Sequence, residues 1–322
     1  MKSHVLYIKI IAMLAIIAVG AMGLSYGLHI GTPAKTPPVS NPTASDGTFT
    51  IVTSFYPIYT MTAMIADGID GVEVINLVDN HVGCLHDYQM TVEDRKTLEK
   101  ADVLVINGAG AEPFLEAALD TMPDLKVIDL SAVLDDLIAS CDDHSHDHDH
   151  GHADGVNSHT WVSPRQYAVM FNHLSLLLSK LDPSHVSDYT ARSVPHQEQI
   201  INPMVHRVET AAAAFHGVPT VLLHDSMAYL ARDLGLNVVA SLNVGEESAV
   251  DSHALKEAEE VLRSCDRALI LGDAQYGTDS YLTELCEDTT VIAVDIVVSG
   301  EEASTAWVDA MTALSESLEA AV

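Results

Sequence analysis

The sequence predicts an α/β protein in which two similar lobes flank one long helical segment. Short runs rich in β-branched residues alternate with helical patterns from residue 48 to about 139, and the alternation resumes at 220. This alternation is typical of parallel sheets, because each parallel crossover needs a long connection, usually a helix. Between 187 and 215 there is no strand pattern, and apolar residues recur at helical spacing. We therefore expect an N-terminal lobe at 48–186, a connecting helix at 187–215 and a C-terminal lobe at 216–322.

The residues ahead of the first lobe have the pattern of a secretion signal. Lys2 and Lys9 precede an apolar run at 10–24, and small and polar residues follow it. We interpret 1–30 as a signal peptide or an uncleaved N-terminal anchor. Residues 31–47 are rich in Pro, Thr and Ser, as expected of a flexible tether. The predicted location is therefore extracytoplasmic, in a periplasm or at a cell surface.

The N-terminal lobe should contain four strands and four helices. Runs such as TFTIVTS and VLVIN are β-rich, and the segments between them carry apolar residues at helical spacing. The predicted strands are 48–54, 72–78, 103–107 and 126–129. The predicted helices are 58–66, 92–100, 113–121 and a short one at 132–139.

The connecting segment and the C-terminal lobe follow the same reasoning. Pro195 and Pro203 should break or kink the connecting helix, since each lacks a backbone donor and clashes with the preceding turn. The predicted strands of the C-terminal lobe are 220–223, 238–240, 268–271 and 291–294. Its predicted helices are 226–234, 251–265, 278–287 and a terminal one from 304.

Charge and cysteine content restrict the partners and the compartment. Lys and Arg total 15 against 46 Asp and Glu, which gives a formal net charge of -31 and argues against nucleic acid and anionic membranes as partners. Four cysteines in a secreted chain are allowed to pair. Cys265 and Cys286 each end a helical pattern just before a strand, so we predict a disulfide between them. Cys84 and Cys141 either form a second bridge or stay free.

The segment 142–154, DDHSHDHDHGHAD, alternates histidines with carboxylates. Nothing in it is apolar enough to offset the entropy of ordering, so we expect a loop. Neutral imidazole is a good ligand for zinc, whereas the alternatives are an expression tag or a solvated acidic loop. A tag would stand at a terminus and would rarely alternate with Asp. We predict that the loop collects metal ions through five histidines: His144, His146, His148, His150 and His152.

Three further histidines, His86, His159 and His224, lie at junctions between predicted strands and helices. Open α/β sheets place their ligand sites at this edge. Asp295 ends the strand VIAVD and supplies a carboxylate. A single histidine in such a place is more often a hydrogen-bonded loop residue. The four residues together form an N3O set that suits zinc, and two ligands from each lobe would hold the ion in the cleft.

Several segments, in order, resemble motifs of the substrate-binding receptors of zinc and manganese ABC transporters. The opening VTSFYPIYTMTAMIADGIDGVEVINLV looks like the first strand, helix and strand of that family. LHDYQMT resembles its PHDYEPT motif, and KADVLVINGAGAEPFLE resembles its KADLLVYNGAGLEPWLE segment. SHTWVSP is similar to PHVWLDP, and LLHDSMAYLARDLGL is similar to HDAFGYLARRYGL. The resemblance runs from residue 48 almost to the C-terminus.

The resemblance implies two four-stranded parallel lobes joined by one rigid helix. It also implies an extracytoplasmic monomer that binds Zn²⁺ through His86, His159, His224 and Asp295 and presents it to a membrane permease. Manganese receptors of the family usually carry glutamate at the position of His224. The segment VDIVVSG lacks the family's LDPLG form, so Asp273 and Asp279 stand beside Asp295 as alternative carboxylates.

Three other functions compete with the zinc receptor. A manganese receptor and a surface adhesin share the family's fold, but an adhesin needs an exposed apolar or basic patch that this acidic sequence does not show. A zinc hydrolase would use three protein ligands and an open position. The sequence has no HExxH or comparable motif that would supply its base, so we do not expect an enzyme.

Overall fold

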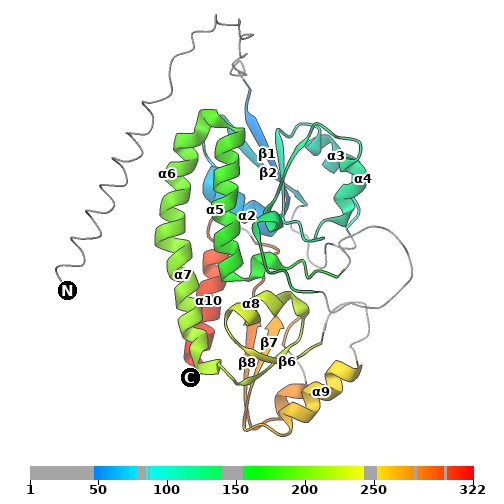
Figure 1. The fold of residues 1–322 in the computed structure, drawn as a ribbon, viewed down its shortest axis with the longest axis vertical. Helices are drawn as coiled ribbons and strands as arrows, with labels where there is room; N and C mark the ends of the chain where they lie inside the picture. The colour runs from blue at the N-terminus through cyan, green and yellow to red at the C-terminus, as the bar shows by residue number, and fades with distance from the viewer. Residues whose placement is uncertain are drawn as a thin grey trace, which may run out of the picture. The chain divides into compact units, whose positions relative to one another are not determined.

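The computed structural model describes residues 47–78, 85, 88–139, 155–242, 252–278, 281–300 and 303–322. Its described part contains two parallel four-stranded sheets flanked by helices, which confirms the predicted fold class (Figure 1). The strand orders are β2-β1-β3-β4 and β6-β5-β7-β8, so the second sheet repeats the first. In each sheet the first strand lies in the middle, and the chain moves to opposite sides of it. Open α/β sheets bind ligands beyond the carboxyl ends of the strands at such a switch point.

The first sheet and its helices form what we call the N-terminal lobe. Its strands are β1 (Phe49–Phe55), β2 (Val72–Val78), β3 (Val103–Ile106) and β4 (Lys126–Asp129). Its helices are α2 (Tyr56–Ala66), α3 (Val92–Leu98) and α4 (Glu116–Leu119). Helix α3 begins with a capping box, in which the Thr91 and Asp94 side chains each accept from the other residue's backbone amide.

The second sheet and its helices form the C-terminal lobe. Its strands are β5 (Pro219–Leu222), β6 (Asn237–Ser241), β7 (Arg267–Asp273) and β8 (Asp288–Val294). Its helices are α8 (Ala228–Asp233), α9 (Ser252–Leu262) and the terminal α10 (Ala306–Ala320).

The lobes are joined by α6 (Val186–His196) and α7 (Asn202–Ala212), which run end to end, and by α5 (Pro164–Leu181), which packs beside them (Figure 1). Ser163 is the N-cap of helix α5, and its side chain accepts from the Gln166 amide. Pro164 is the first residue of the helix, a position that favours proline. Tyr167 and Phe171 lie on its buried face. Helix α7 packs against α10, so the C-terminal helix contributes to the same layer.

One hydrophobic core runs through both lobes and the connecting helices. It includes Ile51 of β1, Phe171 of α5, Leu271 of β7 and Leu314 of α10. Two smaller clusters cover the other faces of the sheets, one under α3 and α4 and one under α9. The central strands β1, β3, β5 and β7 are therefore buried along nearly their whole length, whereas the edge strands are partly exposed.

The prolines of the connecting segment do not break it. The path stays helical from Val186 to Ala212, and five residues between the prolines, Gln197–Ile201, form a π-helical turn. Pro203 has no N–H to bond with the preceding turn, and a π turn is one of the local adjustments that accommodate such a gap. Of the two predicted effects, the break does not occur, and the irregularity between the prolines is this π-helical turn.

Two predicted helices are wrong. The segment predicted as 132–139 is a 3-10 turn, Leu130–Val133, and Leu134 is already extended. Within 278–287 the described residues form only the 3-10 turn Tyr281–Glu284, in which Leu282 alone is buried. With one buried apolar side chain, this segment lacks the face that stabilises a longer helix.

The predicted disulfide between Cys265 and Cys286 is also wrong in this structure. The two residues are neighbours, but both thiols are free. The Cys286 thiol donates to the Cys265 carbonyl oxygen at 3.4 Å, and the Cys265 thiol donates to that of Leu262 at 3.5 Å. Burial, together with the neighbouring Cys286, raises the pKa of Cys265 to about 11. The reactive species in disulfide formation is the thiolate, and this environment disfavours it.

Several predicted features lie outside the described residues. They are the signal or anchor at 1–30, nearly all of the tether, Cys84, His86, the segment 142–154 with Cys141 just before it, and Asp279. In the described ranges, we find no helix with the length and apolar character needed to span a bilayer.

Candidate metal centre

A small cavity lies where the carboxyl ends of the two sheets meet the segment that carries His159. Its volume is about 40 Å³, which is room for a few water-sized occupants and therefore for a metal ion. Its wall includes Phe55 at the end of β1, Ala111 beyond β3, His224 beyond β5 and Asp273 at the end of β7. These are the two switch points of the fold.

The structure brings together two of the four predicted ligands, His159 and His224. Their ring centroids are 5.8 Å apart and their planes are nearly perpendicular. The His224 side chain is 5% exposed and that of His159 is 16% exposed. Both rings line the cavity. Because they are already largely buried, the binding of a metal ion would remove little further water from them.

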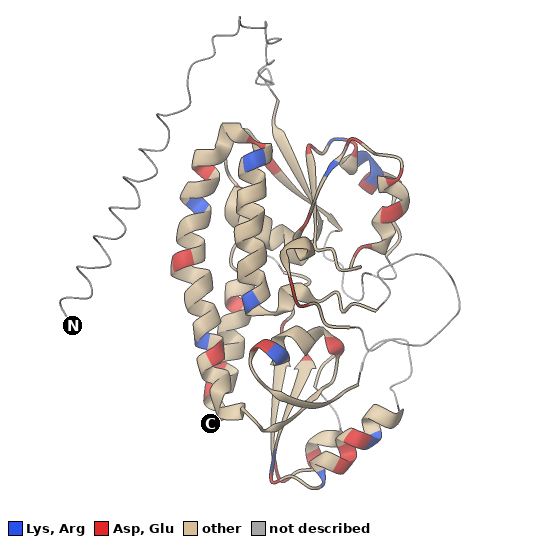
Figure 2. Cartoon of the chain, in the orientation of Figure 1, with Lys and Arg blue, Asp and Glu red and all other residues tan. Residues whose placement is uncertain are grey.

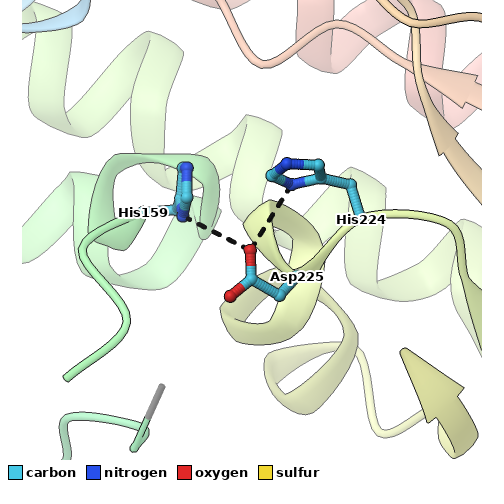
Figure 3. Close-up of side chains that lie close together, drawn as sticks. All are labelled: His159, His224 and Asp225. Carbon is cyan, nitrogen blue, oxygen red and sulfur yellow. Dashed lines mark ion pairs between the residues drawn. The ribbon is translucent and has the colours of Figure 1, made fainter. Parts of the chain in front are cut away.

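Asp225 lies between the two rings. Its Oδ1 atom is 3.4 Å from Nδ1 of His224 and 4.0 Å from Nδ1 of His159. Figure 3 shows that both Nδ1 atoms face this carboxylate and that the opposite ring nitrogens point away from it. The ligand atoms of all three residues lie within 4.8 Å of one another. The hydrogen-bond partners of the two Nδ1 atoms are other groups: Nδ1 of His224 accepts from the Ser226 amide at 3.0 Å, and Nδ1 of His159 faces the Asn157 amide oxygen. Asp225 can therefore contribute an oxygen itself.

Asn157 orients His159 and connects it to the other lobe. Its Oδ1 atom accepts from the His159 backbone N at 2.9 Å and lies 3.1 Å from Nδ1 of the ring. An amide oxygen only accepts, so the proton of a neutral His159 belongs on Nδ1 and Nε2 is left with a lone pair for a metal. The Asn157 amide donates to the Asp225 carbonyl at 2.9 Å. One side chain therefore ties together the backbone around both histidines.

Aromatic rings surround the histidines. Trp161 lies 5.2 Å from the His159 ring, and Tyr276 stacks on His224 at 5.5 Å with an interplanar angle of 17°. The Trp161 indole donates to the Ile296 carbonyl at 2.8 Å. Such walls lower the local dielectric constant and strengthen the interaction between an ion and its ligands.

Buried polar residues anchor the His159 segment on the N-terminal lobe. The Asn107 amide donates to the Ser158 carbonyl at 2.9 Å, and its Oδ1 atom accepts from the Thr160 hydroxyl at 2.7 Å. Asn107 is held in turn by Glu112, which accepts from its backbone N at 2.7 Å. This network fixes the residues on either side of His159.

The other predicted ligands are placed differently. His86 lies outside the described residues, although its neighbour Leu85 lines the cavity. Asp295 is exposed and does not line it, and its Oδ1 atom accepts from the Val297 amide at 2.8 Å. Asp273, one of the two alternative carboxylates, does line it.

Sequence reasoning did not assign roles to Asn157 and Asp225. In the sequence, Asp225 is marked only by its place next to His224, and no pattern marks Asn157. Each acts through a contact that forms only when the two lobes come together.

Comparisons with known proteins come from both sequence and structure. A family described as zinc-uptake complex component A, periplasmic, matches residues 51–321. The zinc-binding lipoprotein AdcA of Streptococcus pneumoniae R6 is 26% identical over 228 residues, which are 70% of this chain and 45% of that lipoprotein. The chain thus spans less than half the length of this relative. The iron-binding protein YfeA of Yersinia pestis is 23% identical over 228 residues, 70% of this chain and 69% of YfeA.

Solved structures show the same fold. The SBP FpvC of Pseudomonas aeruginosa in complex with Ni²⁺ superposes with a TM-score of 0.66 and 20% sequence identity. The superposition covers 84% of this chain and 94% of FpvC.

Proposed function

The chain belongs to the family of the periplasmic component A of zinc-uptake complexes, and on that premise we propose that it captures Zn²⁺ and delivers it to an ABC permease. This membership is the one that the sequence motifs predicted. The family is one of metal-binding transport receptors and not of enzymes, so the zinc hydrolase is set aside. The task of this chain is then to bind an ion and release it to a partner.

The observation that carries the proposal is the pair of imidazoles on one small cavity, with a carboxylate beside them. His159 and His224 present ring nitrogens there, and Asp225 lies within 4.0 Å of both Nδ1 atoms. Two imidazoles and a carboxylate whose ligand atoms lie within 4.8 Å of one another form a donor set that suits zinc. We propose His86 as a third nitrogen donor on the sequence motifs, which also call for a carboxylate at this edge, Asp295 or one of its alternatives Asp273 and Asp279.

Zinc is the proposed ion because the donors are mainly imidazoles. Relatives carry names that refer to zinc and to iron, and FpvC was solved with nickel and with manganese. Imidazole suits zinc, iron and nickel alike, whereas manganese prefers carboxylate oxygen. His224 at the position where manganese receptors usually have glutamate, and the histidines of 142–154, favour zinc over manganese.

The proposed location is extracytoplasmic. The matched family is described as periplasmic and AdcA as a lipoprotein, so a position outside the cytoplasm agrees with both. We propose that residues 1–30 direct the chain there, either as a cleaved signal or as an anchor that keeps the receptor near its permease.

The test replaces each histidine separately in a chain that lacks 142–154, so that other histidines do not obscure the site. His159→Ala and His224→Ala should each weaken Zn²⁺ binding at least ~10-fold, because a four-ligand site loses one donor. The matched control is His253→Ala, whose side chain on α9 is 78% exposed. Affinities are measured by competition with a chromophoric zinc chelator, and circular dichroism checks the fold. Unchanged affinity in folded His159→Ala and His224→Ala would remove this cavity as the receptor site.

A further inference from the structure

Asp273 is a buried carboxylate with an oxygen that has no hydrogen-bond partner. It is the last residue of β7 and is 1% exposed. Its Oδ1 atom accepts from the Gln275 backbone N at 2.8 Å. Its Oδ2 atom has no partner among the described residues. A buried anion in this state is strongly unfavourable unless a positive charge offsets the loss of water.

Strand register places Asp273 beside His224. Strands β5 and β7 are parallel neighbours, and Leu222 pairs with Leu271. The backbone of His224 remains extended, with φ -144° and ψ 144°, so two residues later His224 and Asp273 lie level at the same edge. Side chains two residues apart in a strand share a face, and both residues line the cavity. Burial raises the pKa of the Asp273 carboxyl group, and His224 opposes this shift.

Asp295 occupies the neighbouring position on β8 but lies one residue further along. Asp273 pairs with Val294, so Asp295 follows that pair and has the opposite phase of the pleat. Consistent with this, Val294 is buried and Asp295 is exposed. Both carboxylates accept through Oδ1 from the amide two residues later, so what distinguishes Asp273 is its burial and its position on the cavity.

We propose that Asp273, through its Oδ2 atom, is a carboxylate ligand of the captured metal ion, in the place that the family motif assigns to Asp295. The proposal rests on the proposed function, since it concerns the same cavity. A divalent cation held by His159 and His224 would supply the positive charge that the Asp273 oxygen lacks. In the metal-free chain this carboxylate destabilises the fold, and the bound ion reverses that effect.

The decisive experiment compares Asp273→Asn with Asp295→Asn in the chain that lacks 142–154. Asp273→Asn should weaken Zn²⁺ binding at least ~10-fold, and Asp295→Asn should change it less than ~3-fold, because only the first removes a charged donor oxygen from the ion. The visible absorption spectrum of the Co²⁺-loaded protein should change in Asp273→Asn and stay the same in Asp295→Asn, since it reports the ligand set directly.

The unfolding temperature of the metal-free protein distinguishes a metal ligand from a carboxylate that only supports the fold. The metal-free Asp273→Asn variant should unfold at the same temperature as the parent or above it, because a neutral amide replaces a desolvated charge. A purely structural residue would lower that temperature. Asp273→Ser keeps an acceptor for the Gln275 amide and serves as a second variant if the first does not fold.

The outcomes distinguish this proposal from the proposed function. Strong loss of Zn²⁺ in Asp295→Asn with no loss in either Asp273 variant would overturn the proposal and return the role to Asp295. No loss in any of these carboxylate variants would also overturn it, leaving the histidines as the site. Full affinity in His159→Ala and His224→Ala would instead mean that the proposed function fails at this cavity.

Discussion

At the scale of single residues, Glu112 links the sheet of the N-terminal lobe to the metal cavity. It is 7% exposed and accepts from the Ser54 hydroxyl and from the backbone amides of Asn107 and Gly108. Burial raises the pKa of Glu112 to about 7, although these three donors favour the charged form. Asn107, which Glu112 holds in place, hydrogen-bonds in turn to Ser158 and Thr160 on either side of His159.

Glu112 should make stability depend on pH. Its folded-state pKa lies above the ordinary value of 4.5, so the folded chain keeps this proton where the unfolded chain has released it. The resulting stabilisation is fully present below about pH 4.5 and is lost as pH rises through about 7. Its upper bound is about 3 kcal/mol, from ~1.4 kcal/mol per pKa unit.

Urea unfolding of the metal-free chain at pH 5 and pH 7.5 tests this prediction. Glu112→Gln should flatten the dependence of the unfolding free energy on pH, relative to the parent. Glu73→Gln, at an exposed position on β2, is the control and should leave the dependence as it is. An identical pH dependence in Glu112→Gln and the parent would show that Glu112 does not hold the proton.

At the scale of elements, the turn after β3 shapes one wall of the cavity. Gly108, Ala109 and Gly110 have φ of 77°, 52° and 78°, a conformation that favours glycine. A Cβ atom on Gly108 would lie 1.9 Å from Oδ1 of Asp129, whereas a Cβ on Gly110 would meet nothing within 4 Å. The two glycines thus share the backbone requirement and differ in the space around them.

Gly108→Ala should therefore destabilise the protein more than Gly110→Ala. We expect about 1 kcal/mol for Gly110→Ala from the backbone alone and about 2–4 kcal/mol for Gly108→Ala. Asp129 must move in Gly108→Ala, and its carboxylate accepts from the Ser131 amide and hydroxyl. Chemical denaturation of both variants measures the difference. Equal losses would mean that Asp129 adjusts without penalty.

Strands were more predictable from the sequence than helices. All eight strands that the structure describes overlap their predicted ranges, because runs of β-branched and apolar residues mark them even where, as in β8, the strand is partly exposed. The helices at 132–139 and 278–287 failed because tertiary packing decided their length. At the site, strand ends located His159 and His224. The choice between Asp273 and Asp295 could not be predicted, because it depends on the strand register. Asp273 pairs with Val294, so Asp295 lies one position further along and on the opposite face.

At the scale of the whole molecule, the continuous core limits how the chain can move around the ion. Its residues come from both sheets and from helices α5, α7 and α10. Polar contacts add to this core, including the Tyr229 hydroxyl on the Asn157 carbonyl at 2.8 Å. A large opening of the cavity would expose much of this packed interior. We therefore expect capture and release to involve local rearrangement around the cavity rather than a wide hinge motion.

The acidic surface is separate from the cavity. Asp and Glu residues, coloured red in Figure 2, occur on outer helices such as α9 and α10. Exposed carboxylates raise the local concentration of cations without binding them tightly. Tight binding needs several donors held in fixed positions on rigid elements, which is what the strand ends provide.

The His-rich segment 142–154 should accordingly affect stoichiometry more than affinity. Its alternating His and Asp residues form several shifting, partial coordination sets, whereas the cavity holds its donors in place. Deletion of 142–154 should leave one tightly bound Zn²⁺ per chain and remove weaker additional ions. Metal analysis after dialysis and calorimetric titration measure both quantities, and loading at scarce zinc should become slower. Loss of the tightest site on deletion would mean that this segment is itself the receptor, contrary to the roles given to His159 and His224.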